Sequence, residues 1–254
     1  MTHDLQGTVA LVTGASSGIG EATARRLASH GAAVAIAARR KDRLDRLAAE
    51  IEDGGGRALA IEADVTDRLQ AHAVVAETVD RLGRLDIVVN NAGVMLLGPI
   101  VDAPVEEWDR MVALNVQGLL YIAHAALPAL LTAAAGGPRH VADLVNISSV
   151  AGRVARLGSG VYNLTKHGVG AFSESLRQEV TRRHVRVCIV EPGAVETELT
   201  DHLRDEVREQ LDRRFGDMER MRADDIADAI AYVVTRPPRV AINEVLIRPT
   251  EQEG

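Results

Sequence analysis

The stretch Thr13-Gly14-Ala15-Ser16-Ser17-Gly18-Ile19-Gly20 follows a short apolar run that begins at Thr8, and a segment with helical periodicity starts just after it at Glu21. Its glycines are spaced G-x-x-x-G-x-G. Glycine permits a tight turn and lets the backbone approach a bound group closely. The helix N-terminus after the turn offers free N–H groups and the positive end of the helix dipole. The stretch therefore predicts a strand–turn–helix unit that holds the phosphates of a dinucleotide, and a plain glycine turn is the alternative.

Short apolar runs recur along the rest of the chain, and most are apolar throughout, which is typical of parallel strands buried on both faces. The predicted strands are residues 8–13, 33–38, 58–63, 86–90, 143–148, 186–191 and 244–247. Amphipathic segments such as 21–30, 42–53 and 67–82 lie between them. This alternation predicts a single α/β domain over residues 1–254, a doubly wound parallel sheet with helices on both faces. Residues 133–140 are expected to form a surface loop.

The composition excludes several classes of function. The 254 residues are 46% hydrophobic and carry a net charge of −7, which argues against nucleic acid or an acidic membrane surface as a partner. Cys188 is the single cysteine, so no intrachain disulfide can form, and a reducing compartment is expected. The eight histidines show no local metal-ligand spacing. No basic segment precedes an apolar one at the start of the chain. We therefore expect a cytoplasmic protein without a metal site.

One long stretch, from Met111 to Pro138, contains no charged residue and is long enough to span a bilayer. Asn115, Gln117 and His124 interrupt it with polar groups. A helix that is apolar on most sides in a soluble protein is buried on most sides. We expect this segment to be a core or interface helix, and we therefore expect a homo-oligomer, a tetramer or else a dimer. A membrane span is the alternative.

The end of the second predicted strand carries charge of one sign. Ala37-Ala38 is followed by Arg39-Arg40-Lys41, whereas NAD-binding folds of this type place an acidic residue there for the ribose hydroxyls. An arginine can instead pair with a 2′-phosphate through its planar fork. The sequence therefore predicts NADP(H) as cofactor, with Arg39 and Arg40 at its phosphate. The alternative is a group of solvated cations opening a helix, where positive charge is unfavourable.

Tyr162 and Lys166 are four positions apart in a helical context, so their side chains lie on one face of that helix. A nearby ammonium favours the phenolate form of tyrosine, which can then exchange a proton with a carbonyl or an alcohol. A solvated helix pair is the alternative for this short pattern. Ser149 follows a predicted buried strand, at the kind of strand end where open α/β sheets bind ligands.

Taken together, these motifs resemble the short-chain dehydrogenase/reductase family over essentially the whole chain. The resemblance rests on Thr13–Gly20, Asn90-Asn91-Ala92-Gly93, Asn115, Ser149, Tyr162-x-x-x-Lys166 and Pro192-Gly193. It implies a Rossmann-type domain with a seven-stranded parallel sheet, usually assembled as a tetramer or a dimer. Within the family, residues 90–99 and 171–180 are similar to the branch of the clavulanic acid dehydrogenases, which are clavaldehyde reductases.

The resemblance also implies roles for individual residues. Tyr162 would be the acid–base, and Lys166 would lower its pKa and hold the nicotinamide ribose. Ser149 would hydrogen-bond the substrate oxygen, and Asn115 would shape a helix kink that holds a relay water. The implied cofactor contacts are Gly14, Ser16, Ser17, Gly18, Ile19, Gly20, Arg39, Arg40, Asp64, Val65, Asn91, Ala92, Gly93, Tyr162, Lys166, Pro192, Gly193, Val195 and Thr197. Ser17 stands where the family often has a basic residue, so more of the phosphate binding falls on Arg39.

These observations lead us to expect an NADPH-dependent reductase that converts an aldehyde or ketone to an alcohol, reversibly. Hydride would come from the cofactor while Tyr162 protonates the oxygen. A non-catalytic NADP-binding or regulatory protein on the same fold is the alternative. Residues 196–222 are dense in charge and are predicted to form a helical lid on the substrate side.

Overall fold

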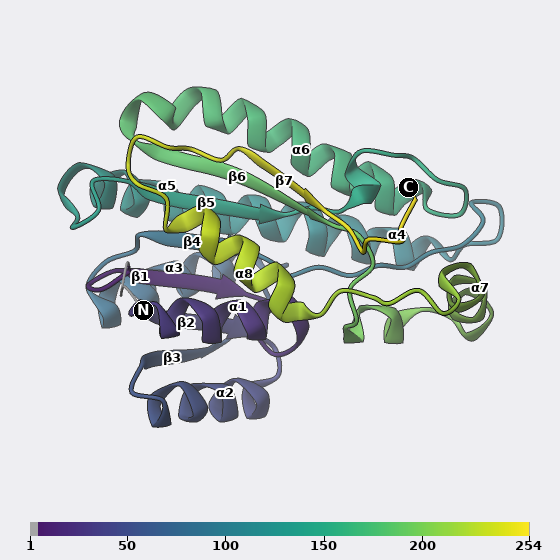
Figure 1. The fold of residues 1–254 in the computed structure, drawn as a ribbon, viewed down its shortest axis with the longest axis horizontal. Helices are drawn as coiled ribbons and strands as arrows, with labels where there is room; N and C mark the ends of the chain where they lie inside the picture. Colours follow the sequence, from purple (N-terminus) through teal and green to yellow (C-terminus); the bar gives the residue numbers. More distant parts are fainter. Residues whose placement is uncertain (1–4, 254) are drawn as a thin grey trace.

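The computed structural model describes residues 5–253, so residues 1–4 and 254 of the predicted domain lie outside the described residues. Seven parallel strands form one sheet in the order β3-β2-β1-β4-β5-β6-β7 (Figure 1). The strands are β1 (Val9–Thr13), β2 (Ala33–Ala38), β3 (Arg57–Glu62), β4 (Ile87–Asn90), β5 (Ala142–Ile147), β6 (Val185–Pro192) and β7 (Glu244–Ile247). The predicted doubly wound sheet is thus confirmed, with strand ends that differ by one residue or none.

Helices connect the strands and cover both faces of the sheet (Figure 1). They are α1 (Gly18–Ser29), α2 (Lys41–Asp53), α3 (Arg68–Leu82), α4 (Val105–Val112), α5 (Leu119–Gly136), α6 (Gly160–Val180), α7 (Asp205–Phe215) and α8 (Ala223–Val234). Shorter helical segments are η1 (Ala113–Gly118), which is π-helical, and the 3₁₀ turns η2 (Val150–Gly152), η3 (Thr181–Arg183) and η4 (Glu198–His202). Helix α1 begins at Gly18, three residues before the predicted start, because the last glycines of the turn already form its first turn.

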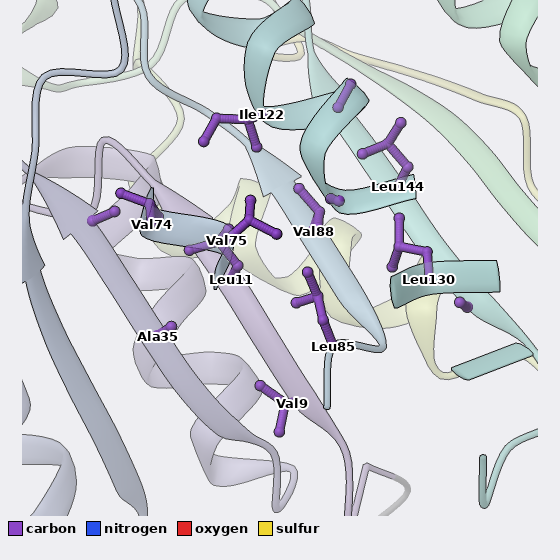
Figure 2. Packing of buried hydrophobic residues seen from close by; sticks show 14 of the residues in the cluster. Val9, Leu11, Ala35, Val74, Val75, Leu85, Val88, Ile122, Leu130 and Leu144 are labelled. Carbon is purple, nitrogen blue, oxygen red and sulfur yellow. The ribbon is translucent and has the colours of Figure 1, made fainter. Parts of the chain in front are cut away.

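Alternate residues of β1 face two separate cores, as the pleat of a strand requires. Val9 and Leu11 belong to the core under α3, α5 and α6, part of which Figure 2 shows around Leu11, Val75 and Leu130. Ala10 and Val12 belong to the core under α1, α2 and α8. The continuous apolar runs of the sequence therefore reflect strands that are buried on both faces.

Helix α3 illustrates how local sequence fixes an element. Asp67 caps it, and its carboxylate accepts hydrogen bonds from the backbone N–H groups of Leu69 (2.7 Å) and Gln70 (3.1 Å). Gly83 ends the helix with a φ of 87°, a left-handed conformation that glycine adopts without strain. Local residues thus fix both ends of α3.

The charge-free segment forms one continuous helical stretch, from α4 through η1 to α5. By length and hydropathy, Val105–Gly136 passes as a membrane span, but 44% of its most apolar window is buried inside the protein. Ile122 and Leu130 pack into the core under the sheet. The prediction of a surface loop over residues 133–140 was wrong at its start: α5 continues to Gly136, and Ala133 is buried, because alanines extend the helix until two glycines end it.

Candidate functional site

A cleft of about 310 Å³ opens at the carboxyl ends of the strands, around the point where the order of the sheet reverses beside β1. Open α/β sheets bind ligands at this point. Apart from Gly20 and Asn115, every predicted site residue lines it: Gly14, Ser16, Ser17, Gly18, Ile19, Arg39, Arg40, Asp64, Val65, Asn91, Ala92, Gly93, Ser149, Tyr162, Lys166, Pro192, Gly193, Val195 and Thr197. Parallel strands bring these residues together because their carboxyl ends share one edge.

Neighbouring segments pack closely against the glycine turn. Gly14 has a φ of 65°, and a Cβ on it would lie 2.8 Å from the Cα of Ala92. The side-chain amide of Asn91 donates to the carbonyl oxygens of Thr13 (3.0 Å) and Gly14 (3.2 Å), which fixes the turn to the end of β4. A Cβ on Gly20 would collide with the carbonyl oxygen of Gly14, so this glycine serves packing behind the turn and not the cleft surface.

The cationic end of the cleft lies after β2. The Arg39 side chain is 65% exposed, and its ion partner is the Asp64 carboxylate at 4.0 Å. The Arg40 guanidinium instead turns back to the glycine turn, where it donates to the hydroxyls of Ser16 (2.9 Å) and Ser17 (2.8 Å). The two predicted arginines therefore have different surroundings: Arg39 extends into solvent, and Arg40 is hydrogen-bonded to the glycine turn.

Asp64 and Val65, predicted as cofactor contacts, lie on the loop after β3 and line the cleft. One carboxylate oxygen of Asp64 already accepts from the backbone N–H (3.0 Å) and the hydroxyl (2.7 Å) of Thr66. Its other oxygen faces Arg39. The Asp64 side chain therefore shapes its own loop in addition to facing the cleft.

At the other end of the cleft, α6 presents Tyr162 and Lys166 one turn apart. Burial raises the pKa of Tyr162 to about 12, while its hydrogen bond with Ser149 lowers that pKa. Burial also lowers the pKa of Lys166 to about 8. The Lys166 ammonium donates to the carbonyl oxygen of Ile147 (2.9 Å) and lies 5.8 Å from the centre of the Tyr162 ring. At neutral pH the phenol is therefore protonated and the lysine is charged.

Lys166 is predicted to lower the pKa of Tyr162. In the structure, a hydrogen bond with the Ser149 hydroxyl lowers the pKa of Tyr162 against the effect of burial. The ammonium lies near the floor of the cleft, where a Cβ on Gly93 would be 3.8 Å from Nζ. The influence of Lys166 on the tyrosine stays a prediction, whereas the Ser149 contact is present.

Asn115 lies in the π-helical segment between α4 and α5, so the helical irregularity expected there is present. Its amide is buried and holds both backbone groups of Val94: the oxygen accepts from the N–H (2.8 Å) and the NH₂ donates to the carbonyl (2.9 Å). The NH₂ also donates to the hydroxyl of Thr165, next to Lys166. Asn115 therefore positions cleft-lining backbone without lining the cleft itself.

Sequence reasoning missed part of the cleft wall. Glu198, Leu199 and His202 line it from η4, within the segment predicted as a lid. The Glu198 carboxylate accepts from Arg40 at 2.8 Å and from Arg43 at 2.5 Å. Only the charge density of the predicted lid hinted at this contact, since the partners lie far apart in the sequence. Among residues 5–253, no cluster of three or more His, Cys, Asp or Glu side chains has a geometry that could hold a metal ion.

Comparisons with known proteins agree with this geometry. Residues 8–208 match the family model described as short chain dehydrogenase. An uncharacterized oxidoreductase of Staphylococcus epidermidis is 37% identical over 241 residues, which cover 95% of this chain and 96% of that protein.

Two solved structures extend the likeness to three dimensions. A closed form of serine dehydrogenase complexed with NADP+ is 32% identical, covers 97% of each chain and has a TM-score of 0.88. A 3-ketoacyl-(acyl-carrier-protein) reductase from Brucella melitensis, complexed with NADH, is also 32% identical, covers 96% of this chain and 97% of its own, and has a TM-score of 0.83. The matched family model and relatives extend over nearly all of the sheet and cleft described above, and the chain belongs to the short-chain dehydrogenase family of oxidoreductases.

Proposed function

We propose that the protein is an NADP(H)-dependent oxidoreductase that reduces an aldehyde or ketone to an alcohol, and that the reaction is reversible. The observation that carries this proposal is the pairing of two hydroxyl groups, those of Tyr162 and Ser149, beside the Lys166 ammonium at one end of the cleft. Arginines lie at its other end. A cofactor that spans the cleft would place its reactive ring at the hydroxyls and its charged end at the arginines.

The cleft fits a dinucleotide on its own geometry. A Cβ on Gly14 would meet Ala92, and a Cβ on Gly18 would meet Thr197. Because both residues are glycine, the backbone at the start of α1 stays uncovered by side chains of the turn. The first N–H groups of a helix have no acceptor within the helix and suit phosphate. The proposed contacts are therefore the cleft-lining residues of the turn, with Asn91, Ala92 and Gly93 along the middle.

The choice of NADP over NAD rests on the charge of the cleft, and it agrees with the NADP+ bound in the serine dehydrogenase structure. Ala38 ends β2 where an acid would accept ribose hydroxyls, and it carries no charge. Arg39 follows it and is open to solvent. A 2′-phosphate placed there would gain a charge-assisted pair with a guanidinium.

The chain's own groups then perform the proton transfer. When bound, the reduced nicotinamide supplies the hydride. Ser149 orients the substrate oxygen, and Tyr162, protonated at neutral pH, donates its proton to that oxygen as the alcohol forms. The buried Lys166 ammonium stabilises the phenolate that remains, since an opposite charge nearby favours the charged form. Oxidation of an alcohol runs through the same groups in reverse.

The substrate side favours a carbonyl compound with an apolar part. Tyr162 packs in a small apolar cluster with Leu96 and Met111. The loops that follow β4 and η2 are joined by a hydrogen bond from the Gly98 N–H to the Gly158 carbonyl oxygen (2.8 Å). We propose the clavaldehyde reductase branch, which residues 90–99 and 171–180 resemble, as a model of the substrate class.

The segment 196–222 would form the lid over that substrate. In the structure it comprises η4, α7 and their connections, and Figure 1 shows α7 standing beyond the layered body of sheet and helices. Among its described side chains, Leu203 and Val207 are buried and most others are polar and exposed. An element with so few buried apolar contacts can move at low cost.

Assembly and location complete the proposal. On α5, Leu127 and Leu131 are half-buried, and on α6 Leu164 is exposed, so apolar surface remains for a second copy of the chain. We propose a homotetramer, or else a dimer, that works in the cytoplasm.

A panel of aldehydes and ketones, followed through the loss of NADPH absorbance, tests the function. The expected result is turnover of several carbonyls by the wild type and a rate lower by about 10²–10⁴-fold in Tyr162→Phe. Tight cofactor binding without turnover of any carbonyl or alcohol in the panel would favour the non-catalytic, regulatory alternative.

A further inference from the structure

The cationic end of the cleft already holds an anion that belongs to the chain. The Glu198 carboxylate, at the start of η4, reaches across to α2 and pairs with Arg40 (2.8 Å) and Arg43 (2.5 Å). The three side chains are between 32% and 42% exposed, so the cluster is open to exchange with solvent and ligands. Glu198 and Arg40 both line the cleft.

The donors of Arg40 are almost fully used in this arrangement. Its Nε and Nη2 donate to the Ser16 hydroxyl, Nη2 also donates to Ser17, and Nη1 donates to Glu198. A guanidinium has five N–H donors in a fixed plane. A phosphate that approaches Arg40 from the cleft must therefore displace the carboxylate or share Nη1 with it.

We propose that Glu198 is a specificity-determining residue that competes with the 2′-phosphate of NADP for Arg40 and Arg43. This inference rests on the proposed function, since it concerns the cofactor of the same site. Hydrogen bonds from the two arginines hold the pKa of Glu198 at about 2, so its carboxylate stays charged near neutral pH. The bound phosphate would face this negative charge unless η4 moved away.

The arrangement has a direct consequence for binding. In the wild type, the 2′-phosphate of NADP pairs with Arg39. Its interaction with Arg40 is partly offset by the loss of the ion pair between Arg40 and Glu198. NAD carries no 2′-phosphate that competes with Glu198 for Arg40, so we expect its affinity to change little when the ion pair is removed. Glu198 therefore narrows the difference in affinity between the two cofactors and couples phosphate binding to the start of the lid segment.

The test compares dissociation constants, measured by isothermal titration calorimetry, for wild type, Glu198→Gln and Glu196→Gln. Glu196→Gln is the matched control: it removes the same charge two residues away, from a side chain that does not line the cleft. Adenosine 2′,5′-bisphosphate probes the phosphate site alone, and 5′-ADP, which lacks the 2′-phosphate, reports whether the variants remain folded at this site.

We expect Glu198→Gln to bind NADP+ and adenosine 2′,5′-bisphosphate about three- to tenfold more tightly, the effect of releasing two half-exposed ion pairs. NAD+ and 5′-ADP should bind as they do to wild type, and Glu196→Gln should match wild type throughout. Unchanged or weaker NADP+ binding by Glu198→Gln would refute the competition, and weaker binding would make Glu198 a clasp over the bound cofactor.

The two proposals can fail separately. If wild type binds NADP+ no better than NAD+, the proposed cofactor is wrong. If wild type prefers NADP+ and Glu198→Gln has the same constants, the cofactor assignment stands and only the role of Glu198 is refuted.

Discussion

Replacing Arg39 tests the cofactor assignment most directly. The side chain is 65% exposed and its ion partner, Asp64, is 4.0 Å away, so removing the guanidinium costs the free protein little. Toward a 2′-phosphate, a charge-assisted hydrogen bond is worth about 1.5–3 kcal/mol when protected from water. Exposure reduces this toward the range of about 0.2–1 kcal/mol measured for solvent-exposed pairs. We therefore expect Arg39→Gln to lower kcat/KM for NADPH by up to about fivefold.

The double variant Ala38→Asp, Arg39→Gln should go further. Ala38 is nearly buried at the end of β2, so an aspartate there would face the adenosine ribose at short range. It would repel a 2′-phosphate and accept from ribose hydroxyls. The ratio of kcat/KM for NADPH to that for NADH should fall to one or below. The value of kcat should change little, because neither substitution lies at the end of the cleft that holds Tyr162.

The assay is steady-state kcat/KM with both cofactors and one saturating carbonyl substrate. Lys41→Gln is the control, since Lys41 is also a cation at the start of α2 but pairs with Asp45 (2.7 Å) and does not line the cleft. A wild type that prefers NADH, or a double variant that keeps the full NADPH preference, would show that Arg39 is only a solvated surface cation.

Further predictions concern catalysis, assembly and stability. Tyr162→Phe keeps the packed ring and should lower single-turnover reduction by about 10²–10⁴-fold with cofactor affinity unchanged; activity within a few-fold of wild type would exclude the mechanism. Alcohol oxidation needs the phenolate form of Tyr162, and burial raises the pKa of this tyrosine to about 12, so the oxidation rate should rise with pH. Lys166→Met should shift that rise to higher pH because the stabilising cation is lost. An identical pH profile in the variant would show that Lys166 does not affect the pKa of Tyr162. Light scattering at micromolar concentration should give a tetramer or a dimer, and a monomer mass would contradict the proposed interface. Asp67→Ala should lower the free energy of unfolding by about 1 kcal/mol in a urea titration, and no change would mean that the cap of α3 is solvated at no cost.

The sequence by itself determined the elements whose signals are local. Continuous apolar runs marked the strands to within a residue of their ends, and the glycine turn marked the place where the cleft opens. The four-residue spacing alone placed Tyr162 and Lys166 on one face of a helix. Where the local signal was ambiguous the prediction failed, as at residues 133–136, where the alanines extend α5 and the glycines only end it.

Tertiary structure alone decided which distant groups meet. The ion pairs of Glu198 with α2, the hold of Asn115 on Val94 and the contact of Ser149 with Tyr162 each join segments that no periodicity relates. It also separated Arg39 from Arg40, which are neighbours in the sequence but lie in solvent and against the glycine turn respectively. The physical reason is that strand and helix patterns depend on neighbours a few residues away, whereas the surroundings of a side chain, and hence its pKa and its free donors, depend on which loops the folded sheet brings to the same edge.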